Sequence, residues 1–357
     1  MNNPVARDKG EIKVRVGILG AGSVTELYHL PVLRNVPGVD VAWLCDTVLD
    51  RAKRLGRMFA VPKAVARLDE CPDADIVLMA IPVGLRREPL RHAFGRGWHV
   101  LCEKPFAVST KEHDEILEEA SVAGVHVGVG LMRRFYRANL LARQIIESRI
   151  LRDVVQVTVV EGNRQAATGR ADEWYQGDLD ASGGGMFMER GVHMADMLLT
   201  ILGAEGFSVQ DCSQKLVNGL EMETRVAGGL TRSDRSEVTF RLAVSQLNDL
   251  PQGMVIEFPE AALRLGTFPD EPLRLCTKGN FPVADLESGR GARTVYQAFY
   301  LEWENFIGHC TSECPSAIDA ASTRMTTAFV EECYRSSERA NAGHPPGGLG
   351  GILGTGT

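Results

Sequence analysis

Residues 12–33, IKVRVGILGAGSVTELYHLPVL, decide the fold of this chain. The run 12–19 is apolar and rich in β-branched residues, which predicts a strand that ends at the glycine turn Gly20-Ala21-Gly22. A helical pattern follows to about residue 35, although Pro31 lacks a backbone donor and should kink it. The first glycine permits a tight turn, and the second lets the backbone approach a pyrophosphate, which the helix N-terminus attracts. This order of elements indicates a dinucleotide-binding unit.

An acidic residue at the end of the next strand supports this interpretation. The third glycine of the usual fingerprint is replaced by Thr25, but Asp46 directly follows the apolar run 39–45. A carboxylate there accepts hydrogen bonds from the adenosine ribose and would repel a 2′-phosphate, so we expect NAD to be preferred over NADP. In the alternative interpretation, the glycines only form a turn and Asp46 caps the next helix. Arg51 and Arg54 are expected on the exposed face of that helix.

Strand and helix patterns alternate through the first third of the chain and then change. The alternation predicts βαβ units and a parallel sheet, with strands at 12–19, 39–45, 75–81, 98–102 and 125–129 and helices at 23–35, 48–59, 86–95 and 109–123. After about residue 150, strands follow one another with few helices, which predicts a largely antiparallel sheet. Its segments are strands at 154–160, 207–212, 236–247, 253–258, 261–266 and 272–276 and helices at 186–202, 296–309 and 317–338.

Composition limits the classes of protein to which the chain can belong. With 357 residues, two domains are the default expectation. A net charge of -7 does not fit a general nucleic-acid binder, and no apolar run is long enough to span a membrane. The polar residues 1–11 lack a signal-peptide core, so we expect a cytoplasmic protein. The 8 cysteines form no CxxC pair, and the cluster His309, Cys310 and Cys314 lacks a second ligand pair, so no metal site is expected.

Four motifs resemble the glucose–fructose oxidoreductase/inositol dehydrogenase family, also called Gfo/Idh/MocA. They are GILGAGSVTELYHLPVL (17–33), HVLCEKP (99–105), GVGLMRRF (128–135) and SGGGMFMERGVHMADML (182–198), and the resemblance covers about residues 12–336. It implies an α/β fold: an N-terminal Rossmann domain at 12–131 and a C-terminal α/β domain with an open, mostly antiparallel sheet at 132–338, where a substrate would bind and copies would associate. Residues 339–357 are expected to be a disordered tail. The resemblance also implies a homodimer or homotetramer.

The same resemblance assigns roles to individual residues. Lys104 matches the catalytic lysine, His193 the proton-transferring histidine, and Glu189 stands where most members have an aspartate. We assign cofactor binding to residues at the ends of the predicted parallel strands: Gly20, Gly22, Ser23, Val24, Asp46, Pro82 and Glu103. The family interconverts a secondary alcohol and a carbonyl by hydride transfer with NAD or NADP.

These residue types suit that reaction. Oxidation of an alcohol requires removal of the hydroxyl proton, which a histidine with an ordinary pKa near ~6.5 can accept. A lysine ammonium polarises the oxygen and stabilises developing alkoxide charge. Glu189, His193 and Asp196 share one face of a helix that is otherwise apolar, so their charges need a purpose or a partner. We expect Glu189 to bind a substrate hydroxyl or orient His193, and Asp196 to pair within the fold.

Other polar residues are open to two interpretations. Arg133, Glu161, Asn163, Arg164 and Trp174 are either substrate contacts or ordinary polar loop residues. Arg86 stands near a position where many family members have a histidine; it could contact a phosphate or carboxylate, but we expect it on the surface.

The leading hypothesis is an NAD(P)-dependent dehydrogenase or ketoreductase that acts on a sugar, cyclitol or nucleotide-sugar. A non-catalytic nucleotide-binding sensor or regulator is one alternative, which loss of Lys104 or His193 would favour, but both are present. A second is a glycosidase that recycles bound NAD, and a third is a reductase of a non-sugar substrate.

Overall fold

The computed structural model of the chain describes residues 13–164, 179–312 and 314–343. They form two compact units. The first comprises the described residues up to Phe106, Lys111–Phe135 and Ala292–Thr323; the second comprises Ala107–Thr110, Tyr136–Gly291 and the described residues from Arg324.

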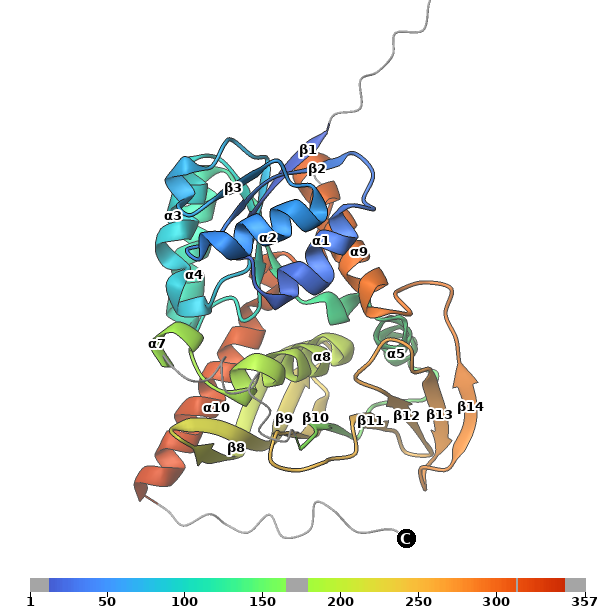
Figure 1. The fold of residues 1–357 in the computed structure, drawn as a ribbon. Helices are drawn as coiled ribbons and strands as arrows, with labels where there is room; N and C mark the ends of the chain where they lie inside the picture. Colours follow the sequence, from blue (N-terminus) through green and yellow to red (C-terminus); the bar gives the residue numbers. More distant parts are fainter. Residues whose placement is uncertain (1–12, 165–178, 313, 344–357) are drawn as a thin grey trace, which may run out of the picture. The chain divides into compact units, whose positions relative to one another are not determined.

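The first unit is built on a six-stranded parallel sheet with the order β3-β2-β1-β4-β5-β6, of which β1, β2 and β3 are labelled in Figure 1. Its strands are β1 Val14–Leu19, β2 Val39–Cys45, β3 Lys63–Val65, β4 Ile76–Met79, β5 His99–Glu103 and β6 Val127–Gly130. The strand order reverses between β1 and β4, and ligands of open parallel sheets bind beyond the carboxyl ends of strands at such a point. The predicted parallel sheet is confirmed; the short strand β3 is an addition to it.

The helix after the glycine turn is irregular. It begins as a π-helical turn, Thr25–His29, and continues as α1, Leu30–Leu33. Pro31 lies in the first turn of α1 and has no N–H to donate, so the preceding turn adopts the wider π-helical pattern. The disruption expected at Pro31 therefore takes the form of a π-helical turn.

Helix α9, Val295–Ser312, belongs to the first unit although sequence analysis placed this stretch in the second domain. Phe299, Trp303 and Phe306 are its buried aromatic residues, and they join the apolar core of the parallel sheet. Burying three aromatic side chains is worth several kcal/mol, which explains why the chain returns to this unit. The other helices here are α2 Leu49–Phe59, α3 Arg87–Gly95 and α4 Thr110–Ala123, whose first residue lies in the second unit.

The second unit is built on an eight-stranded sheet with the order β14-β13-β12-β11-β7-β10-β9-β8. Among the described strands of this sheet, only β10 and β7 pair in parallel; the other neighbours are antiparallel, as predicted. The strands are β7 Gln156–Gly162, β8 Ala204–Val217, β9 Leu220–Arg232, β10 Glu237–Ser245, β11 Gly253–Glu257, β12 Ala261–Leu265, β13 Leu273–Thr277 and β14 Pro282–Leu286. Strands β9 and β14 were not predicted from the sequence.

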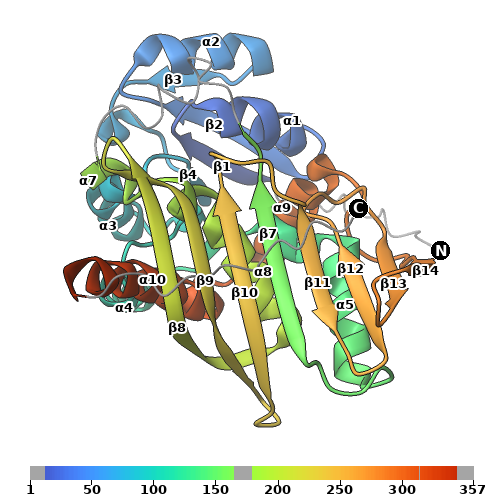
Figure 2. The same cartoon turned by 90° about the horizontal axis from the view of Figure 1, so that it is seen from below.

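Three helices lie behind this sheet in Figure 2, on one of its faces: α5 Arg137–Ser148, α8 Val192–Leu202 and α10 Arg324–Gly343. A short helix, α7 Leu179–Ser182, precedes the triple glycine. Helix α10 continues to Gly343, past the predicted start of the tail at residue 339; the rest of that tail, 344–357, lies outside the described residues. Among the helices that the structure describes, none combines the length and the apolar character needed to cross a membrane.

Candidate active site

The glycine turn follows β1 at the carboxyl edge of the parallel sheet. Gly20 has a φ of +105°, and a Cβ there would lie 2.2 Å from the carbonyl oxygen of Ala80. A Cβ on Gly22, in contrast, would meet nothing within 4 Å. Thr25, in place of the third glycine, donates its hydroxyl to the carbonyl oxygen of Gly20 at 2.7 Å. The Thr25 hydroxyl therefore stabilises the turn, while the second glycine faces open space that a ligand could occupy.

Asp46 connects the end of β2 to this turn. Its Oδ2 accepts a hydrogen bond from the Ala21 N–H and its Oδ1 one from the Val48 N–H, both at 2.8 Å. A carboxylate oxygen has more than one acceptor site, so these bonds leave capacity for the hydroxyls of a ribose. Arg51 and Arg54 are exposed, as expected, and Arg54 forms two hydrogen bonds of 2.6 Å with Glu26.

Glu103 ends β5 and is buried, with 7% of its surface exposed. Its Oε1 accepts from His29 Nε2 at 2.9 Å, and its Oε2 accepts from the Lys104 N–H at 3.1 Å. The indole of Trp303 donates to His29 Nδ1 at 3.0 Å, which fixes the proton of this imidazole on Nε2. Burial disfavours the charged form, but the hydrogen bond from His29 and the nearby positive charges outweigh it and lower the pKa of Glu103. This carboxylate, itself held by His29, thus fixes the backbone of Lys104 through the Lys104 N–H.

Arg86 is not a surface residue, in contrast to the expectation from the sequence. It is only 4% exposed, and its guanidinium donates to the carbonyl oxygens of Ile81, Glu103 and Pro105. Two of these partners lie far along the chain, so the local sequence gave no sign of its burial. The remaining predicted cofactor residues of this unit, Ser23, Val24 and Pro82, are exposed or half-buried.

In the second unit, the triple glycine is held by two side chains that sequence analysis missed. Oε1 of the buried Glu221, on β9, accepts from the N–H groups of Gly185 and Phe187 at 2.6 and 3.2 Å. The hydroxyl of Tyr334, on α10, donates to the same oxygen at 2.5 Å. A Cβ on Gly184 would lie 2.3 Å from the Tyr334 hydroxyl, so glycine is required here. Desolvation and the Glu221 carboxylate raise the pKa of Tyr334, which keeps this hydroxyl a donor.

The helix that follows carries Glu189 and His193. It opens with a π-helical turn, Phe187–Gly191, before α8, so the regular α-helical spacing expected from the sequence does not hold over its first turn. Glu189 is half-buried, and His193 is buried with 7% exposure. Asp196 is 1% exposed and accepts a hydrogen bond from the Thr326 hydroxyl at 2.9 Å, so the prediction that it pairs within the fold is confirmed.

The predicted substrate residues fall in both units. Arg133 is buried in the first unit, and Glu161, at the end of β7, is buried in the second. Asn163 accepts a hydrogen bond of 2.6 Å from Arg190, so the structure brings the end of β7 to the helix of Glu189 and His193. The sequence could have indicated a role for Arg190, since it is a charged residue in a mostly apolar helix. The backbone N–H of Arg164 donates to Asp249 at 2.8 Å, and Trp174 lies outside the described residues.

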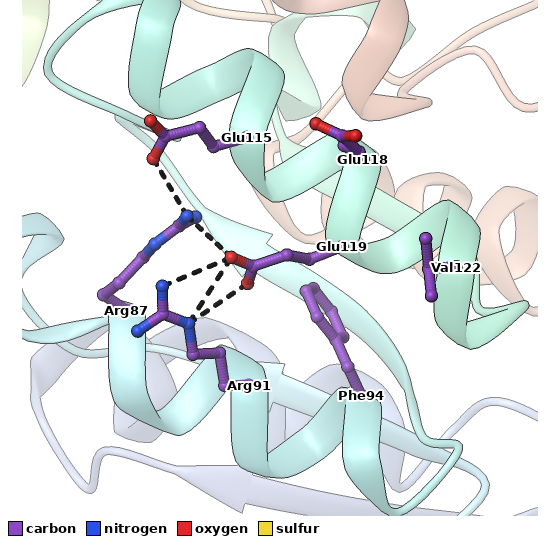
Figure 3. Close-up of a pocket in the computed structure, with 7 residues that line it drawn as sticks. All are labelled: Arg87, Arg91, Phe94, Glu115, Glu118, Glu119 and Val122. Atoms are coloured by element: carbon purple, nitrogen blue, oxygen red, sulfur yellow. Dashed lines mark hydrogen bonds and ion pairs between the residues drawn. The ribbon is translucent and has the colours of Figure 1, made fainter.

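A surface pocket of about 630 Å³ lies between α3 and α4 of the first unit (Figure 3). The predicted site residues do not line it. Arg87 points at Glu115 and Glu119 in Figure 3, and Arg91 points at Glu119, and these side chains pair, so both cations of the pocket are neutralised by carboxylates on α4. In the described ranges, no group of three His, Cys, Asp or Glu side chains is placed to hold a metal ion.

A glycine turn at the switch point of a parallel sheet, joined to a second unit with a mostly antiparallel sheet, defines a two-part Rossmann protein. Two models of the Gfo/Idh/MocA family match more than half of the chain: "Oxidoreductase family, NAD-binding Rossmann fold" at residues 14–131 and "Oxidoreductase family, C-terminal alpha/beta domain" at residues 143–264. The chain therefore belongs to this family, and its first unit has the family's NAD-binding Rossmann fold, which confirms the resemblance seen in the sequence.

Curated relatives include the 1,5-anhydro-D-fructose reductase of Ensifer adhaerens, which is 28% identical over 60% of this chain and 65% of its own length. The scyllo-inositol 2-dehydrogenase (NAD(+)) of Bacillus subtilis is 25% identical over 58% of this chain and 59% of its own. The chain thus spans less than two thirds of the length of these relatives.

Solved structures share the fold over nearly the whole chain. An oxidoreductase from Agrobacterium radiobacter, in complex with NAD+, L-tartaric acid and magnesium, has a TM-score of 0.76 at 16% identity and covers 92% of this chain and 97% of its own. A 3-ketoreductase from Actinomadura kijaniata, in complex with NADP and TDP-benzene, has a TM-score of 0.78 at 16% identity and covers 91% and 98%.

Proposed function

We propose that the chain is an NAD(P)-dependent oxidoreductase that interconverts a secondary alcohol and a ketone on a sugar, cyclitol or nucleotide-sugar. One observation carries the proposal. The glycine turn, Asp46, Pro82 and Lys104 follow the carboxyl ends of β1, β2, β4 and β5, so four predicted site positions lie at one edge of one parallel sheet. Open parallel sheets bind their ligands at this edge.

The first unit would bind the cofactor through groups of distinct chemistry. The open face at Gly22 and the first N–H groups of the following helix suit a diphosphate, and the Asp46 carboxylate suits the hydroxyls of a ribose. When bound, the nicotinamide supplies the hydride-accepting or hydride-donating ring. The Asp46 carboxylate would repel a 2′-phosphate, and Arg54 is already paired with Glu26, so we expect NAD to be preferred over NADP.

The chain's own residues would handle the proton and the charge on oxygen. The Lys104 ammonium polarises the reacting oxygen and stabilises negative charge that develops on it. His193 accepts the hydroxyl proton during oxidation and returns it during reduction. Glu189 binds a neighbouring hydroxyl or orients His193, and Arg133, Glu161, Asn163, Arg164 and Trp174 remain candidates for contacts with a polyhydroxylated substrate.

The cofactor and the reaction can be tested separately. We expect NAD to bind more tightly than NADP in a fluorescence titration, and one member of a panel of sugars, cyclitols and nucleotide-sugars to change the nicotinamide absorbance. Lys104→Ala and His193→Ala should each lower turnover by about 10²–10⁴-fold while NAD binding survives. Near-normal turnover in either variant would refute that residue's role.

Other results would support the alternatives. Tight NAD binding without turnover on the whole panel would favour a sensor, and sugar release without net absorbance change would favour an NAD-recycling glycosidase. We also infer a homodimer or homotetramer, because the face of the second sheet opposite α5, α8 and α10 has no described helix over it in Figure 2. A cytoplasmic location stays a prediction from the polar start of the sequence. Light scattering that gives the mass of a single chain would contradict the oligomer.

A further inference from the structure

Arg86 is a deeply buried cation at the carboxyl edge of the parallel sheet. It lies between a short 3-10 turn, Val83–Leu85, and the start of α3. With 4% exposure, its guanidinium has lost most of its contact with water. Burial of a charge costs several kcal/mol unless hydrogen bonds replace the lost solvation, so an arginine persists at such a position only where its bonds are strong or useful.

Two of the three residues to which Arg86 donates, Glu103 and Pro105, flank Lys104 in the chain. Its Nη1 donates to the carbonyl oxygen of Glu103 at 2.5 Å and also to that of Pro105. One nitrogen therefore bridges the carbonyl oxygens of the two residues that flank the proposed catalytic lysine. The Lys104 N–H, in turn, donates to the Glu103 carboxylate at 3.1 Å, so the backbone is held before, at and after this residue.

The other end of the guanidinium is fixed as well. Its Nε donates to the carbonyl oxygen of Ile81 at 2.7 Å, directly after β4. Arg86 thus ties the segment after β4 to the segment after β5, two neighbouring strands whose carboxyl ends lie at the proposed cofactor site. All three of these acceptors are backbone carbonyls, so the contacts depend on the shape of the guanidinium and not on pairing with a carboxylate.

We propose that Arg86 is a positioning residue of the active site, which fixes the Glu103–Pro105 backbone and thereby aims the Lys104 ammonium. The proposal rests on the proposed function of Lys104. A lysine ammonium stands at the end of a flexible four-carbon chain, so its position depends on how firmly the backbone of the residue is held. A displacement of about 1 Å at a reacting group can cost about 100-fold in rate.

The shape of the side chain distinguishes this role from simple charge. A lysine at position 86 keeps the positive charge but has one nitrogen at the end of a flexible stem, which cannot reach Ile81, Glu103 and Pro105 together. Arg86→Lys is therefore the informative variant. Arg91→Lys is its matched control, because Arg91 lies on α3, which begins directly after Arg86, is half-exposed and pairs only with Glu88 and Glu119 in the described structure.

The first test needs no substrate. Hydrogen exchange of the peptide that covers Glu103–Phe106 should be faster by about tenfold or more in Arg86→Lys, because loss of the bridging bonds lets this segment open. Arg91→Lys should exchange like the unchanged protein, and NAD affinity should remain within about threefold in both variants. Unchanged exchange of that peptide in Arg86→Lys would overturn the proposal, whether or not the chain has the proposed activity.

The second test measures the coupling to Lys104. We expect Arg86→Lys to lower kcat by about 10–100-fold with little change in KM, and the same substitution in a Lys104→Ala background to have almost no further effect. A merely structural role predicts equal losses in both backgrounds, and that result would refute the positioning role. If the unchanged protein turned over no member of the panel, the proposed function would fail, while the exchange test would still decide whether Arg86 holds the turn.

Discussion

Asp46 shows how one side chain can serve both the fold and a ligand. Its two carboxylate oxygens hold the glycine turn and the start of the next segment through Ala21 and Val48. Sequence analysis offered these as competing interpretations, a ribose contact or a structural cap, but the bonds to the backbone do not exhaust the acceptor sites of the carboxylate. The two roles are therefore compatible in one residue.

The charge of Asp46 should decide between the two nicotinamide cofactors. Asp46→Asn keeps an acceptor for one backbone N–H and removes the charge, so we expect NAD affinity to fall about tenfold, or about 1.4 kcal/mol, and NADP affinity to rise relative to it. Titration of both cofactors by fluorescence measures this. Asp50→Asn, an exposed acid in the first turn of α2, is the control and should leave both affinities unchanged. An unaltered ratio of the two affinities in Asp46→Asn would contradict the assignment.

The Tyr334 hydroxyl is the second residue whose removal gives a clear expectation. Tyr334→Phe deletes one hydrogen bond to the buried Glu221 carboxylate, which should lower the free energy of unfolding by about 1.5–3 kcal/mol. Because this bond holds the start of the segment that carries Glu189 and His193, we also expect a higher KM for substrate with unchanged NAD affinity. Chemical denaturation and steady-state kinetics measure the two effects.

Tyr296→Phe is the control for this substitution, since Tyr296 is 53% exposed. A Tyr334→Phe protein with the stability of the Tyr296→Phe protein would mean that the hydroxyl contributes nothing to the triple-glycine turn.

At the scale of elements, helix α9 contains an unusual buried carboxyl. Glu302 is 0% exposed, and in the described structure its two oxygens have no hydrogen-bond partner. Desolvation, together with the negative charge of Glu103, raises its pKa well above the ordinary value of 4.5. The folded protein therefore holds this proton to higher pH than the unfolded chain does.

This difference makes the stability of the fold depend on pH. An unfolded chain loses the Glu302 proton near pH 4.5 and the folded protein only at higher pH, so the free energy of unfolding falls as the pH rises above 4.5. Glu302→Gln removes the titrating group and keeps the shape. We expect its melting temperature to exceed that of the unchanged protein by several degrees at pH 8 and by much less at pH 5. Calorimetry at the two pH values tests this, with the exposed neighbour changed by Glu304→Gln as the control. Parallel pH profiles for all three proteins would show that Glu302 is not held neutral.

The elements also show what the sequence could and could not predict. The strands β1, β2, β4 and β5 were predictable because each is a mostly apolar run that ends at or shortly before a glycine, acid or proline. Strand β9 was not, because Glu221, Glu223 and Gly228–Gly229 interrupt its apolar pattern and its pairing with β8 and β10 depends on distant residues. The roles of some side chains could not be predicted either, because their partners are distant in the sequence. The partners of Arg86 lie up to 19 residues away, and that of Tyr334 lies 113 residues away.

At the scale of the whole molecule, the predicted cofactor should stabilise the fold. A ligand that binds only the folded state at 100 times its dissociation constant adds about 2.7 kcal/mol to the free energy of unfolding. We expect NAD to raise the melting temperature of the chain, and Asp46→Asn to need about tenfold more NAD for the same shift. Differential scanning fluorimetry across NAD concentrations measures this. A melting temperature that is independent of NAD would contradict cofactor binding by the first unit.

The return of α9 to the first unit also constrains how the protein is made. The core around Ile18, Leu44 and Leu101 is completed by Phe299, Trp303 and Phe306, which leave the ribosome only after most of the second unit, though not its helix α10, has been synthesised. During translation, the parallel sheet of the first unit therefore exposes an apolar surface to which a chaperone can bind. This surface becomes covered only when α9 has been synthesised.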